Sequence, residues 1–498
     1  MTAETPGKTA TLDQLGLTAI GGAMREINAL CVDSRAVEPG NLFAALPGTQ
    51  VHGARFIPQA LKSGAAAILT DAEGARMHVA LLRASGAALV IAEDPRQVLA
   101  YAAALWWGAQ PETMTAVTGT NGKTSVATFA RQIWTLLGHS ACNFGTTGVE
   151  GAYQAPLAHT TPEPITLHRV LAEAARAGVT HGCLEASSHG LAQRRLDGVQ
   201  LQAAAFTNFS QDHLDYHATF EAYFDAKAGL FRRLLPPEGV AVINFDGHRG
   251  GDMALIAADR GIQVLGVGRS THAQLRMLGH RYEADGQLLR FGWDAREYQV
   301  HLPLIGGFQS ENVLVAAGLA IGTGEHPGAV FDTLAELETV RGRMQLVARR
   351  DNGAAVYVDF AHTPDAIATA LKAMRPHVMG RLIAIVGAGG DRDATKRPLM
   401  GRAAAENADL VFVTDDNPRS EDPAVIRQAV LIGAPEAIEV GDRAEAILRA
   451  VDALGPGDTL LIAGKGHETG QVVGASVYPF DDAEQASVAV AALDGRLA

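Results

Sequence analysis

The sequence predicts an α/β protein built from three domains. Its 498 residues are too many for one hydrophobic core, because domains usually contain about 100–200 residues. Short apolar runs alternate with helical stretches along the chain, which is typical of α/β sheets. A glycine-rich loop also lies between an expected strand and an expected helix, at residues 118–125. We expect the domains to span residues 1–110, 111–340 and 341–498.

The composition excludes several classes of protein. Hydrophobic residues make up 47% and charged residues 19%, a balance that indicates a globular rather than a disordered chain. The formal charge of −13 excludes a general basic surface for nucleic acid. The three cysteines have no short spacing that would form a zinc site or a disulfide framework, which fits a reducing cytosol. Without a signal-peptide pattern or a run of about 18 apolar residues, we expect a cytoplasmic protein with no membrane insertion.

The first domain is expected to be a small α/β unit. Apolar runs at residues 65–69 and 88–91 predict strands, and polar helical stretches alternate with them. The turn-rich segment at residues 108–111 predicts a linker to the second domain.

The second domain is expected to begin with a strand at residues 114–117, followed by the glycine-rich loop. Apolar residues then recur at three- and four-residue spacing from Val126 to Leu137, which predicts a helix that ends near Gly138. In such a loop, backbone N–H groups and a helix amino terminus face phosphate oxygens. Lys123 adds a positive charge, and Thr124 can place its hydroxyl on Mg²⁺.

The glycine-rich loop has the form GxxGK[ST], because Val117 occupies the position of the first glycine in the strict Walker pattern. A glycine turn that merely opens a helix is the alternative. We predict that the loop binds a nucleoside triphosphate, with ATP the expected one. The loop residues are Gly119, Thr120, Asn121, Gly122, Lys123, Thr124 and Ser125.

Three further features of the second domain suggest metal chemistry. Glu185 ends an apolar run at residues 182–185, where its carboxylate could bind Mg²⁺ or cap a turn. Two histidines and two aspartates follow the next apolar run, within residues 207–217, and could bind metal or form a hydrogen-bonded turn. Lys227 lies on an apolar helical face with Phe224 and Phe231. Its ammonium could extend to water, or it could be chemically altered for function.

The third domain is expected to contain strands at residues 355–360, 382–386, 410–414 and 459–463, separated by helical stretches. Each strand leads into a loop rich in glycine, aspartate, asparagine or histidine. Because ligands bind beyond the carboxyl ends of strands in open parallel sheets, we expect these loops to carry binding residues.

Several motifs together resemble the Mur ligases of peptidoglycan synthesis, nearly end to end. They are GTNGKTS (119–125), HTTPEP (159–164), LEASSHGLAQRR (184–195), TNFSQDHLDYH (207–217) and DAKAGLF (225–231). DDNPRSED (415–422) and GKGHE (464–468) resemble the subgroup that adds diaminopimelate. The resemblance implies a small α/β uridine-nucleotide domain, a central P-loop ATPase-like domain with a parallel sheet, and a carboxyl-terminal Rossmann-like α/β domain.

The resemblance also implies substrates and the residues that bind them. The implied substrates are ATP, UDP-N-acetylmuramoyl-L-alanyl-D-glutamate and meso-diaminopimelate, and we expect a monomer. Asn312, Arg343 and Asp359 join the loop in binding ATP. The residues implied for the UDP-muramoyl dipeptide are Ser34, Thr49, Gln50, Val51, Thr160, Thr161, Ser187, Gln193 and Arg195. The residues implied for diaminopimelate are Arg392, Asp416, Asn417, Pro418, Arg419, Gly464 and Glu468.

For the metal, the resemblance implies two Mg²⁺ ions. Thr124 and Glu185 would hold the first, whereas His213 and a carbamylated Lys227 would hold the second. The expected reaction activates the D-glutamyl γ-carboxylate as an acyl phosphate, which the diaminopimelate amine then attacks.

Two related enzymes are alternatives to this function. A lysine-adding ligase lacks the DNPR sequence, and a folylpolyglutamate synthetase lacks the uridine domain. A non-catalytic nucleotide-binding regulator is the alternative from another class.

Overall fold

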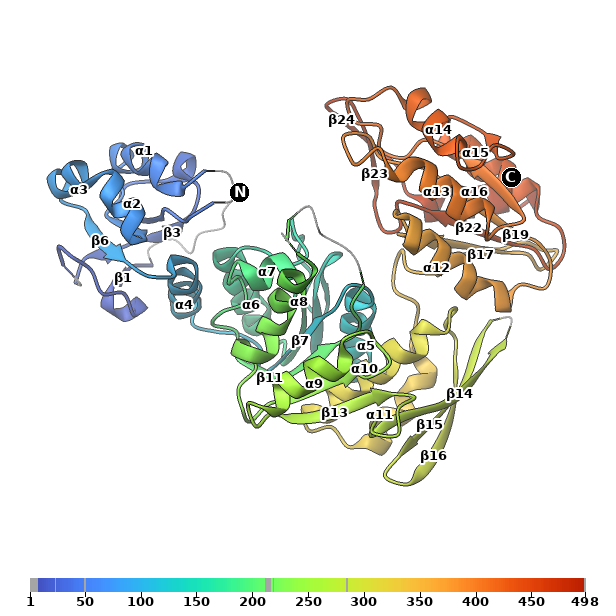
Figure 1. Ribbon diagram of the computed structural model, residues 1–498, viewed down its shortest axis with the longest axis horizontal. Helices are drawn as coiled ribbons and strands as arrows, with labels where there is room; N and C mark the ends of the chain where they lie inside the picture. Colours follow the sequence, from blue (N-terminus) through green and yellow to red (C-terminus); the bar gives the residue numbers. More distant parts are fainter. Residues whose placement is uncertain are drawn as a thin grey trace. The chain divides into compact units, whose positions relative to one another are not determined.

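The structure is a computed structural model that describes residues 8–22, 24–48, 51–210, 216–217, 219–283 and 285–496. The chain divides into two compact units, residues 1–267 with 315–327, and residues 268–314 with 328–498. The first unit contains the amino-terminal sheet and the larger parallel sheet, and the second contains the carboxyl-terminal sheet (Figure 1). No helix of the described residues is long and apolar enough to cross a membrane.

The amino-terminal part has a four-stranded parallel sheet in sequential order. Its strands are β3 (Ala29–Cys31), β4 (Asn41–Ala44), β5 (Ala67–Thr70) and β6 (Ala88–Ile91), and its helices are α1 (Ile57–Lys62), α2 (Ala72–Met77), α3 (Val79–Ser85) and α4 (Pro95–Trp107). The predicted strands at 65–69 and 88–91 are confirmed as β5 and β6. Helix α4 begins with Pro95 after Asp94, whose carboxylate accepts from Gln97 N, and ends at Gly108 with φ of 68°.

The central sheet lies in the same unit as the amino-terminal sheet. Within that unit its strand order is β13-β12-β11-β7-β10-β8-β9, and every pair is parallel except β8 with β9. The strands are β7 (Thr113–Thr118), β8 (Ala141–Gly145), β9 (Gly148–Gly151), β10 (His181–Glu185), β11 (Leu201–Phe206), β12 (Val240–Asn244) and β13 (Gln263–Gly268). The helices are α5 (Lys123–Leu136), α6 (Pro164–Arg176), α7 (Ser188–Ala192), α8 (Phe220–Gly229), α9 (Gly250–Ala258) and α10 (Phe308–Gly322).

Residues 275–302 differ from the expected alternation of strand, loop and helix. They form an antiparallel meander of β14 (Leu275–Glu283), β15 (Gly286–Trp293) and β16 (Arg296–Leu302). Helix α10 follows the meander, and α11 (Pro327–Thr333) follows α10. Its strands alternate buried with exposed side chains, such as buried Met277 beside exposed Arg276 and Leu278. That period of two is the pattern of a sheet with one buried face, which needs no intervening helix.

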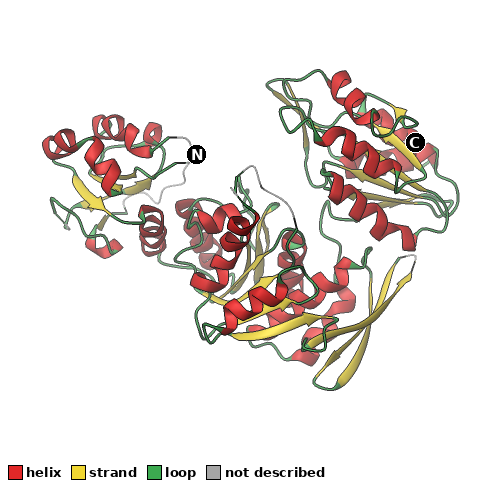
Figure 2. Cartoon of the chain, viewed as in Figure 1, coloured by secondary structure: helices red, strands yellow, loops and turns green. Residues whose placement is uncertain are grey.

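The carboxyl-terminal sheet has six strands in the order β17-β18-β22-β19-β20-β21, and only β17 is antiparallel to its neighbour. Figure 2 distinguishes the helices and strands of the chain by colour. The strands are β17 (Gln345–Arg349), β18 (Ala355–Asp359), β19 (Leu382–Val386), β20 (Leu410–Val413), β21 (Ile438–Glu439) and β22 (Thr459–Ala463). The helices are α12 (Pro364–Met374), α13 (Lys396–Ala405), α14 (Pro423–Leu431), α15 (Arg443–Asp452) and α16 (Asp482–Leu493), and β23 (Gly470–Val473) pairs with β24 (Ser476–Pro479). All four strands predicted for this domain are confirmed.

Helices cover both faces of the carboxyl-terminal sheet, which explains why its strands read as unbroken apolar runs. Tyr357 and Ala384 point into the core on one face, whereas Val356 and Ile383 point into the core on the other. Strands buried on both faces lose the alternation of polar and apolar residues.

One buried ion pair links α15, α16 and the end of β22. The Arg443 guanidinium donates from Nε and Nη2 to the Asp482 carboxylate at 2.7 Å each, and neither side chain is exposed. Nη2 also donates to the carbonyl oxygen of Ala463 at 3.0 Å. The pair therefore holds the last residue of β22, directly before the glycine-rich segment at residues 464–468.

We expect Asp482→Ala to destabilise the protein by about 3–5 kcal/mol, because it leaves the buried guanidinium without its counter-charge. Arg449→Ala is the matched control, since it removes an exposed pair with Glu445 on the same helix, worth about 0.3–0.5 kcal/mol. Calorimetric unfolding of both variants tests this expectation. Equal losses of stability in the two variants would contradict it.

Candidate active site

Three neighbouring strands bring the predicted catalytic loops to one edge of the central sheet. Strand β7 lies between β10 and β11, with Val117 opposite Glu185 and Thr118 opposite Phe206. Because all three strands are parallel, the loops that follow residues 118, 185 and 206 begin at the same edge. Residues almost a hundred positions apart in the sequence therefore become neighbours.

The glycine-rich loop is tied to the segment that follows β11. Thr120 N donates to the Asn208 carbonyl oxygen at 2.9 Å, and Asn121 N donates to Asn208 Oδ1 at 3.0 Å. Gly122 adopts the left-handed conformation with φ of 85°, and α5 begins at the next residue, as predicted. Lys123 Nζ donates to the carbonyl oxygens of Gly119 and Thr120 at 3.1 and 2.9 Å. The loop is thus held in shape, with its lysine folded over it.

Glu185 is a buried carboxylate beside the loop, with only 2% of its surface exposed. Thr124 Oγ1 donates to Glu185 Oε2 at 2.9 Å, and Thr146 donates from its backbone N and its hydroxyl at 2.8 and 3.3 Å. All of these donors are neutral, so they do not balance the carboxylate charge. A buried carboxylate next to a threonine hydroxyl is a donor set that suits Mg²⁺.

Lys227 also reaches the glycine-rich loop. The side chain is 1% exposed, so its ammonium does not extend to water. Nζ donates to the Gly119 carbonyl oxygen at 2.7 Å and lies 4.5 Å from the centre of the Tyr223 ring. The tip of this lysine is therefore held against the loop that is predicted to bind phosphate.

Four of the nine residues implied for the UDP-muramoyl dipeptide form one connected network. Thr161 Oγ1 donates to the Glu185 carbonyl oxygen at 2.6 Å and accepts from Ser187 N at 3.0 Å. Arg195 Nη1 donates to the Thr161 carbonyl oxygen at 2.6 Å, and Arg195 Nη2 donates to Gln193 Oε1 at 2.8 Å. Burial lowers the pKa of the Arg195 guanidinium, which remains charged at neutral pH.

Thr160 joins this network through the Thr146 hydroxyl, 2.9 Å away. In the amino-terminal part, Ser34 is buried, with Oγ 3.3 Å from Gln59 Oε1, and Val51 is exposed. Thr49, Gln50 and His213 lie outside the described residues. The structure therefore gives no contacts for these three.

In the second unit, Asp359 organises the segment around Arg343. Its carboxylate accepts from Met344 N at 2.7 Å and from Ala361 N at 2.8 Å. Burial raises the pKa of Asp359, and the charge of Arg343 opposes this rise. The Arg343 guanidinium lies 4.6 Å from the centre of the Phe360 ring. In the same unit, the Asn312 amide donates to Gln309 Oε1 at 3.0 Å and is buried.

The loops after β20 and β22 meet around a buried lysine. Lys465 is fully buried, and its Nζ donates to Asn417 Oδ1 and Glu468 Oε2 at 3.2 Å each and to the Gly470 carbonyl oxygen at 2.6 Å. The Asn417 amide donates to Glu468 Oε2 at 2.9 Å. Gly464 packs so closely that an added Cβ would lie 2.6 Å from an Asp416 carboxylate oxygen. The structure thus brings four of the seven residues implied for diaminopimelate into one cluster.

The arginines of this region lie near the same loops. Arg419 has a left-handed backbone with φ of 51°, and its Nη1 donates to the Gly390 carbonyl oxygen at 2.8 Å. Pro418 is buried between Asn417 and Arg419, whereas Arg392 is exposed. Gly390 N donates to the Asn417 carbonyl oxygen at 2.9 Å, which ties the loop after β19 to the loop after β20.

Comparison with known proteins assigns the family. Profiles described as "Mur ligase family, catalytic domain", "Mur ligase middle domain" and "Mur ligase, glutamate ligase domain" match residues 26–119, 117–320 and 342–466. The chain belongs to the Mur ligase family. Each of its three parts matches a separate domain of that family, which confirms the predicted three-domain α/β fold.

Individual Mur ligases resemble the chain over nearly its whole length. UDP-N-acetylmuramoyl-L-alanyl-D-glutamate--2,6-diaminopimelate ligases from Bradyrhizobium diazoefficiens and Caulobacter vibrioides are 50% and 49% identical, over 94% of this chain and 96% of each relative. A solved structure of an enzyme with that name superimposes with a TM-score of 0.71 at 33% identity, covering 98% of this chain and 99% of the other.

Three residues of this Mur ligase contact the predicted site residues but were not themselves predicted from the sequence. Thr146 contacts both Glu185 and Thr160, the hydroxyl of Tyr216 accepts from Gln193 Nε2 at 2.9 Å, and Lys465 joins Asn417 to Glu468. Thr146 follows the carboxyl end of β8, so its position at a strand end was a usable signal. For Lys465, nothing in the GKGHE motif indicates that the lysine side chain is buried.

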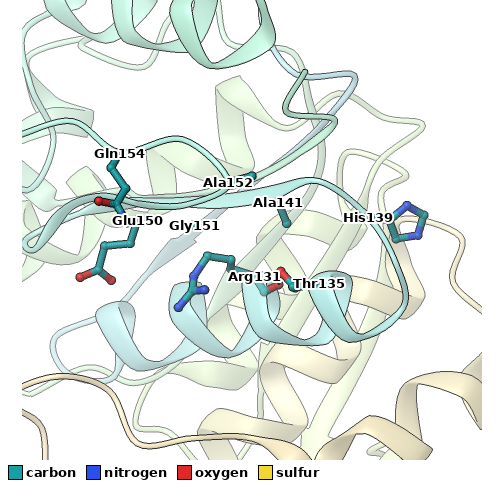
Figure 3. Close-up of a pocket in the computed structure, with 8 residues that line it drawn as sticks. All are labelled: Arg131, Thr135, His139, Ala141, Glu150, Gly151, Ala152 and Gln154. Atoms are coloured by element: carbon teal, nitrogen blue, oxygen red, sulfur yellow. Dashed lines mark hydrogen bonds between the residues drawn. The ribbon is translucent and has the colours of Figure 1, made fainter. Parts of the chain in front are cut away.

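A cavity of about 440 Å³ beside α5 contains none of the predicted site residues of this Mur ligase (Figure 3). It is lined by Arg131, Thr135, His139, Ala141, Glu150, Gly151, Ala152 and Gln154. The cavity lies along the carboxyl-terminal half of α5, whereas the glycine-rich loop runs into the amino-terminal end of that helix. We therefore do not assign the cavity to the candidate active site.

We expect Gly119→Ala to weaken the binding of a non-hydrolysable ATP analogue at least about tenfold, or 1.4 kcal/mol. An added Cβ would lie 1.9 Å from Thr207 Oγ1, which donates to the Asn121 carbonyl oxygen and holds the loop. Gly138→Ala is the control, because Gly138 also has positive φ but has no atom within 4 Å of the added Cβ. Calorimetric titration of both variants measures the effect, and unchanged affinity in Gly119→Ala would refute it.

Proposed function

We propose that this Mur ligase couples ATP hydrolysis to the addition of meso-2,6-diaminopimelate to UDP-N-acetylmuramoyl-L-alanyl-D-glutamate. The product amide forms at the D-glutamyl γ-carboxylate, in the synthesis of peptidoglycan precursors. The observation that carries this proposal is the pair of buried groups at the glycine-rich loop, the Glu185 carboxylate and the Lys227 amine. The names of the relatives that match the chain end to end support the choice of substrates.

The proposed reaction has two chemical steps. In the first, a γ-carboxylate oxygen of the substrate attacks the γ-phosphorus of ATP, and ADP leaves with the electrons of the broken P–O bond. In the second, the diaminopimelate amine attacks the acyl phosphate carbonyl, and the tetrahedral intermediate collapses to an amide and phosphate with loss of a proton. Phosphoryl transfer depends mainly on positioning and charge stabilisation. Lys123 and the backbone N–H groups at the amino terminus of α5 supply both, so no protein nucleophile is required.

Mg²⁺ would be held by the Thr124 hydroxyl and the Glu185 carboxylate. This assignment is based on the burial of the Glu185 carboxylate and on its hydrogen bonds from Thr124 and Thr146, which are neutral donors. A bound Mg²⁺ supplies charge neutralisation for the phosphate oxygens. Thr146 donates from its backbone N to Oε1 and from its hydroxyl to Oε2, so both oxygens of the carboxylate are already oriented.

Lys227 is proposed to act as a carbamate that holds a second Mg²⁺ together with His213. The neutral amine adds to the carbon of CO₂ and loses one proton, which converts a cationic side chain into an anionic oxygen ligand. The position of Nζ, 2.7 Å from the Gly119 carbonyl oxygen, places the modified group beside the glycine-rich loop. Oxygen ligands of this kind are the ones that Mg²⁺ prefers.

The muramoyl dipeptide is proposed to contact Thr160, Thr161, Ser187, Gln193 and Arg195. This network borders Glu185, because Thr161 donates to the Glu185 carbonyl oxygen. Arg195 supplies a planar guanidinium that can bind a carboxylate or a pyrophosphate through two hydrogen bonds. Ser34, Thr49, Gln50 and Val51 are proposed to bind the uridine nucleotide.

The residues after β20 and β22 are proposed to select diaminopimelate over lysine. Diaminopimelate carries a second carboxylate at its far end, whereas lysine has no carboxylate there. Arg419 can bind this second carboxylate through two hydrogen bonds. Glu468 can accept from an ammonium group of the same amino acid, and Lys465 and Asn417 hold its carboxylate in place. A buried charge left without its partner costs several kcal/mol, which corresponds to discrimination of roughly 10²-fold or more.

Phosphate release from ATP tests the proposed reaction directly. With UDP-muramoyl dipeptide present, we expect release with meso-diaminopimelate to exceed release with lysine by about 10²-fold in kcat/KM. Preference for lysine would overturn the substrate assignment, and no release with either amino acid would favour a non-catalytic nucleotide-binding regulator.

In Arg419→Ala, we expect kcat/KM for phosphate release with diaminopimelate to fall toward the value with lysine. An exposed arginine of α13, Arg402→Ala, serves as the control.

For the carbamate, we expect Lys227→Ala to lower kcat at least about 10²-fold, because a positioned metal ligand is lost. Short carboxylates such as acetate are expected to restore part of the activity by occupying the vacated space. The matched control is Lys372→Ala, which removes an exposed lysine from α12. Wild-type activity in Lys227→Ala would exclude a catalytic role for this lysine, and mass spectrometry of the intact protein reports the added CO₂.

A further inference from the structure

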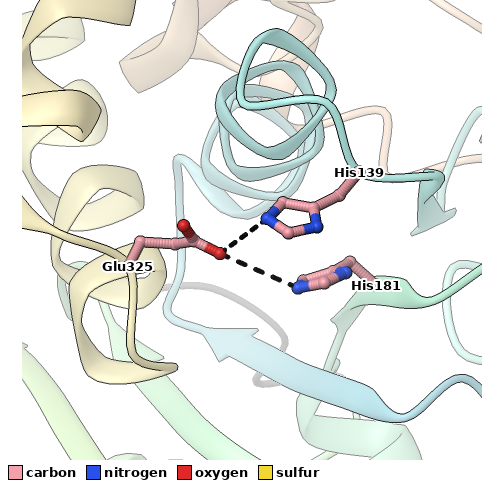
Figure 4. A group of neighbouring side chains, drawn as sticks. All are labelled: His139, His181 and Glu325. Carbon is pink, nitrogen blue, oxygen red and sulfur yellow. Dashed lines mark ion pairs between the residues drawn. The ribbon is translucent and has the colours of Figure 1, made fainter.

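Two histidines and a glutamate from separate elements meet away from the candidate active site (Figure 4). His139 follows α5, His181 is the first residue of β10, and Glu325 follows α10. His139 Nε2 lies 2.8 Å from Glu325 Oε1, and His181 Nε2 lies 4.0 Å from the same oxygen. Their side chains are 34%, 12% and 21% exposed, so the cluster is partly shielded but open to small ions.

Contacts with neighbouring side chains hold the two imidazole rings in place, and the Nε2 atom of each ring faces Glu325. Nδ1 of His181 is hydrogen-bonded to the Thr180 hydroxyl at 2.9 Å, which uses the ring nitrogen remote from Glu325. The Trp134 ring packs 5.4 Å from the His181 ring, and the two imidazole rings lie 4.1 Å apart. A polar partner on the second ring nitrogen is a usual feature of histidines that bind metal, because it fixes the ring orientation.

We propose that His139, His181 and Glu325 form a binding site for one divalent transition metal ion, with Zn²⁺ the best match. The three ligand atoms all lie within 4.8 Å of one another. In a tetrahedral shell with Zn²⁺ about 2.0–2.2 Å from imidazole nitrogen and carboxylate oxygen, two ligand atoms are separated by about 3.3–3.6 Å. Small rotations of the side chains are sufficient to bring all three within reach, and water completes a tetrahedral shell.

This site differs from the proposed Mg²⁺ sites in chemistry and in position. Its two imidazole ligands suit Zn²⁺ or Ni²⁺, whereas the carboxylate and hydroxyl at the glycine-rich loop suit Mg²⁺. Helix α5 separates the two, since the glycine-rich loop runs into its amino-terminal end and His139 follows its last turn. Its 14 residues correspond to a length of about 21 Å.

The position of the cluster indicates a structural role. An ion bound there would join the end of α5, the start of β10 and the segment after α10, which are far apart in the sequence. Such a link closes long loops of the chain and stabilises the folded state over the unfolded one. His139 also lines the cavity beside α5 (Figure 3).

Titration of the full-length protein with Zn²⁺, in buffer with excess Mg²⁺ to occupy oxygen-rich sites, tests the proposal. We expect about one Zn²⁺ per chain and a higher Tm in the wild type. In Glu325→Gln and His181→Gln, the Kd for Zn²⁺ is expected to rise at least about tenfold, and the rise in Tm should disappear. His326→Gln is the matched control, because it removes an exposed histidine next to Glu325 and should leave binding unchanged.

Co²⁺ gives a second readout, since a site with two imidazoles and a carboxylate produces visible absorption bands that the two ligand variants should lose. If His181→Gln does not fold, Glu325→Gln still decides the question, because Glu325 lies in a loop. Equal Zn²⁺ affinity in the wild type and Glu325→Gln would overturn the proposal. Absence of Zn²⁺ binding to the wild type would also overturn it and leave the cluster as an ion pair only.

Discussion

The parallel pairing of β7 with β10 and β11 is the constraint on which the candidate active site depends. It brings Glu185 and the segment after β11 to the edge where the glycine-rich loop begins. Hydrogen bonds from Thr120 and Asn121 to Asn208 then hold the loop in shape. Lys227 reaches the Gly119 carbonyl oxygen from α8 on the same side. A change of register by one residue would turn the Glu185 side chain to the opposite face of the sheet, because side chains alternate along a strand.

Buried charged groups organise the candidate binding residues within each of the two units. In the central domain, the neutral groups of Thr124 and Thr146 donate to the buried Glu185 carboxylate. In the carboxyl-terminal domain, Lys465 is buried among the oxygens of Asn417, Glu468 and Gly470, and it fixes their positions. Burial of such groups costs free energy unless hydrogen bonds compensate for lost water. A preformed polar site offsets this cost by reducing the reorganisation that substrate binding would otherwise require.

Most elements around the site could be predicted from local patterns. The strands at β7, β10, β11, β18, β19, β20 and β22 are bounded apolar runs, and α5 follows a clear three- and four-residue period. The meander at residues 275–302 was missed, because its alternating pattern was not separated from the helical stretches around it. Thr146, Tyr216 and Lys465 were missed as well. These three residues contact Glu185, Gln193 and Asn417, which are 39, 23 and 48 positions away in the sequence. No local sequence pattern records contacts over such distances.

By itself, the sequence determined the α/β class, the glycine-rich loop and the motifs that place the chain among the Mur ligases. These features depend on residue type and on spacing within one segment, and both can be read along the chain. Only the tertiary structure decided that the Lys227 ammonium is buried against the loop and does not extend to water. It also decided that His139, His181 and Glu325 meet. Such pairings depend on sheet order and helix packing, which bring together segments that the sequence keeps apart.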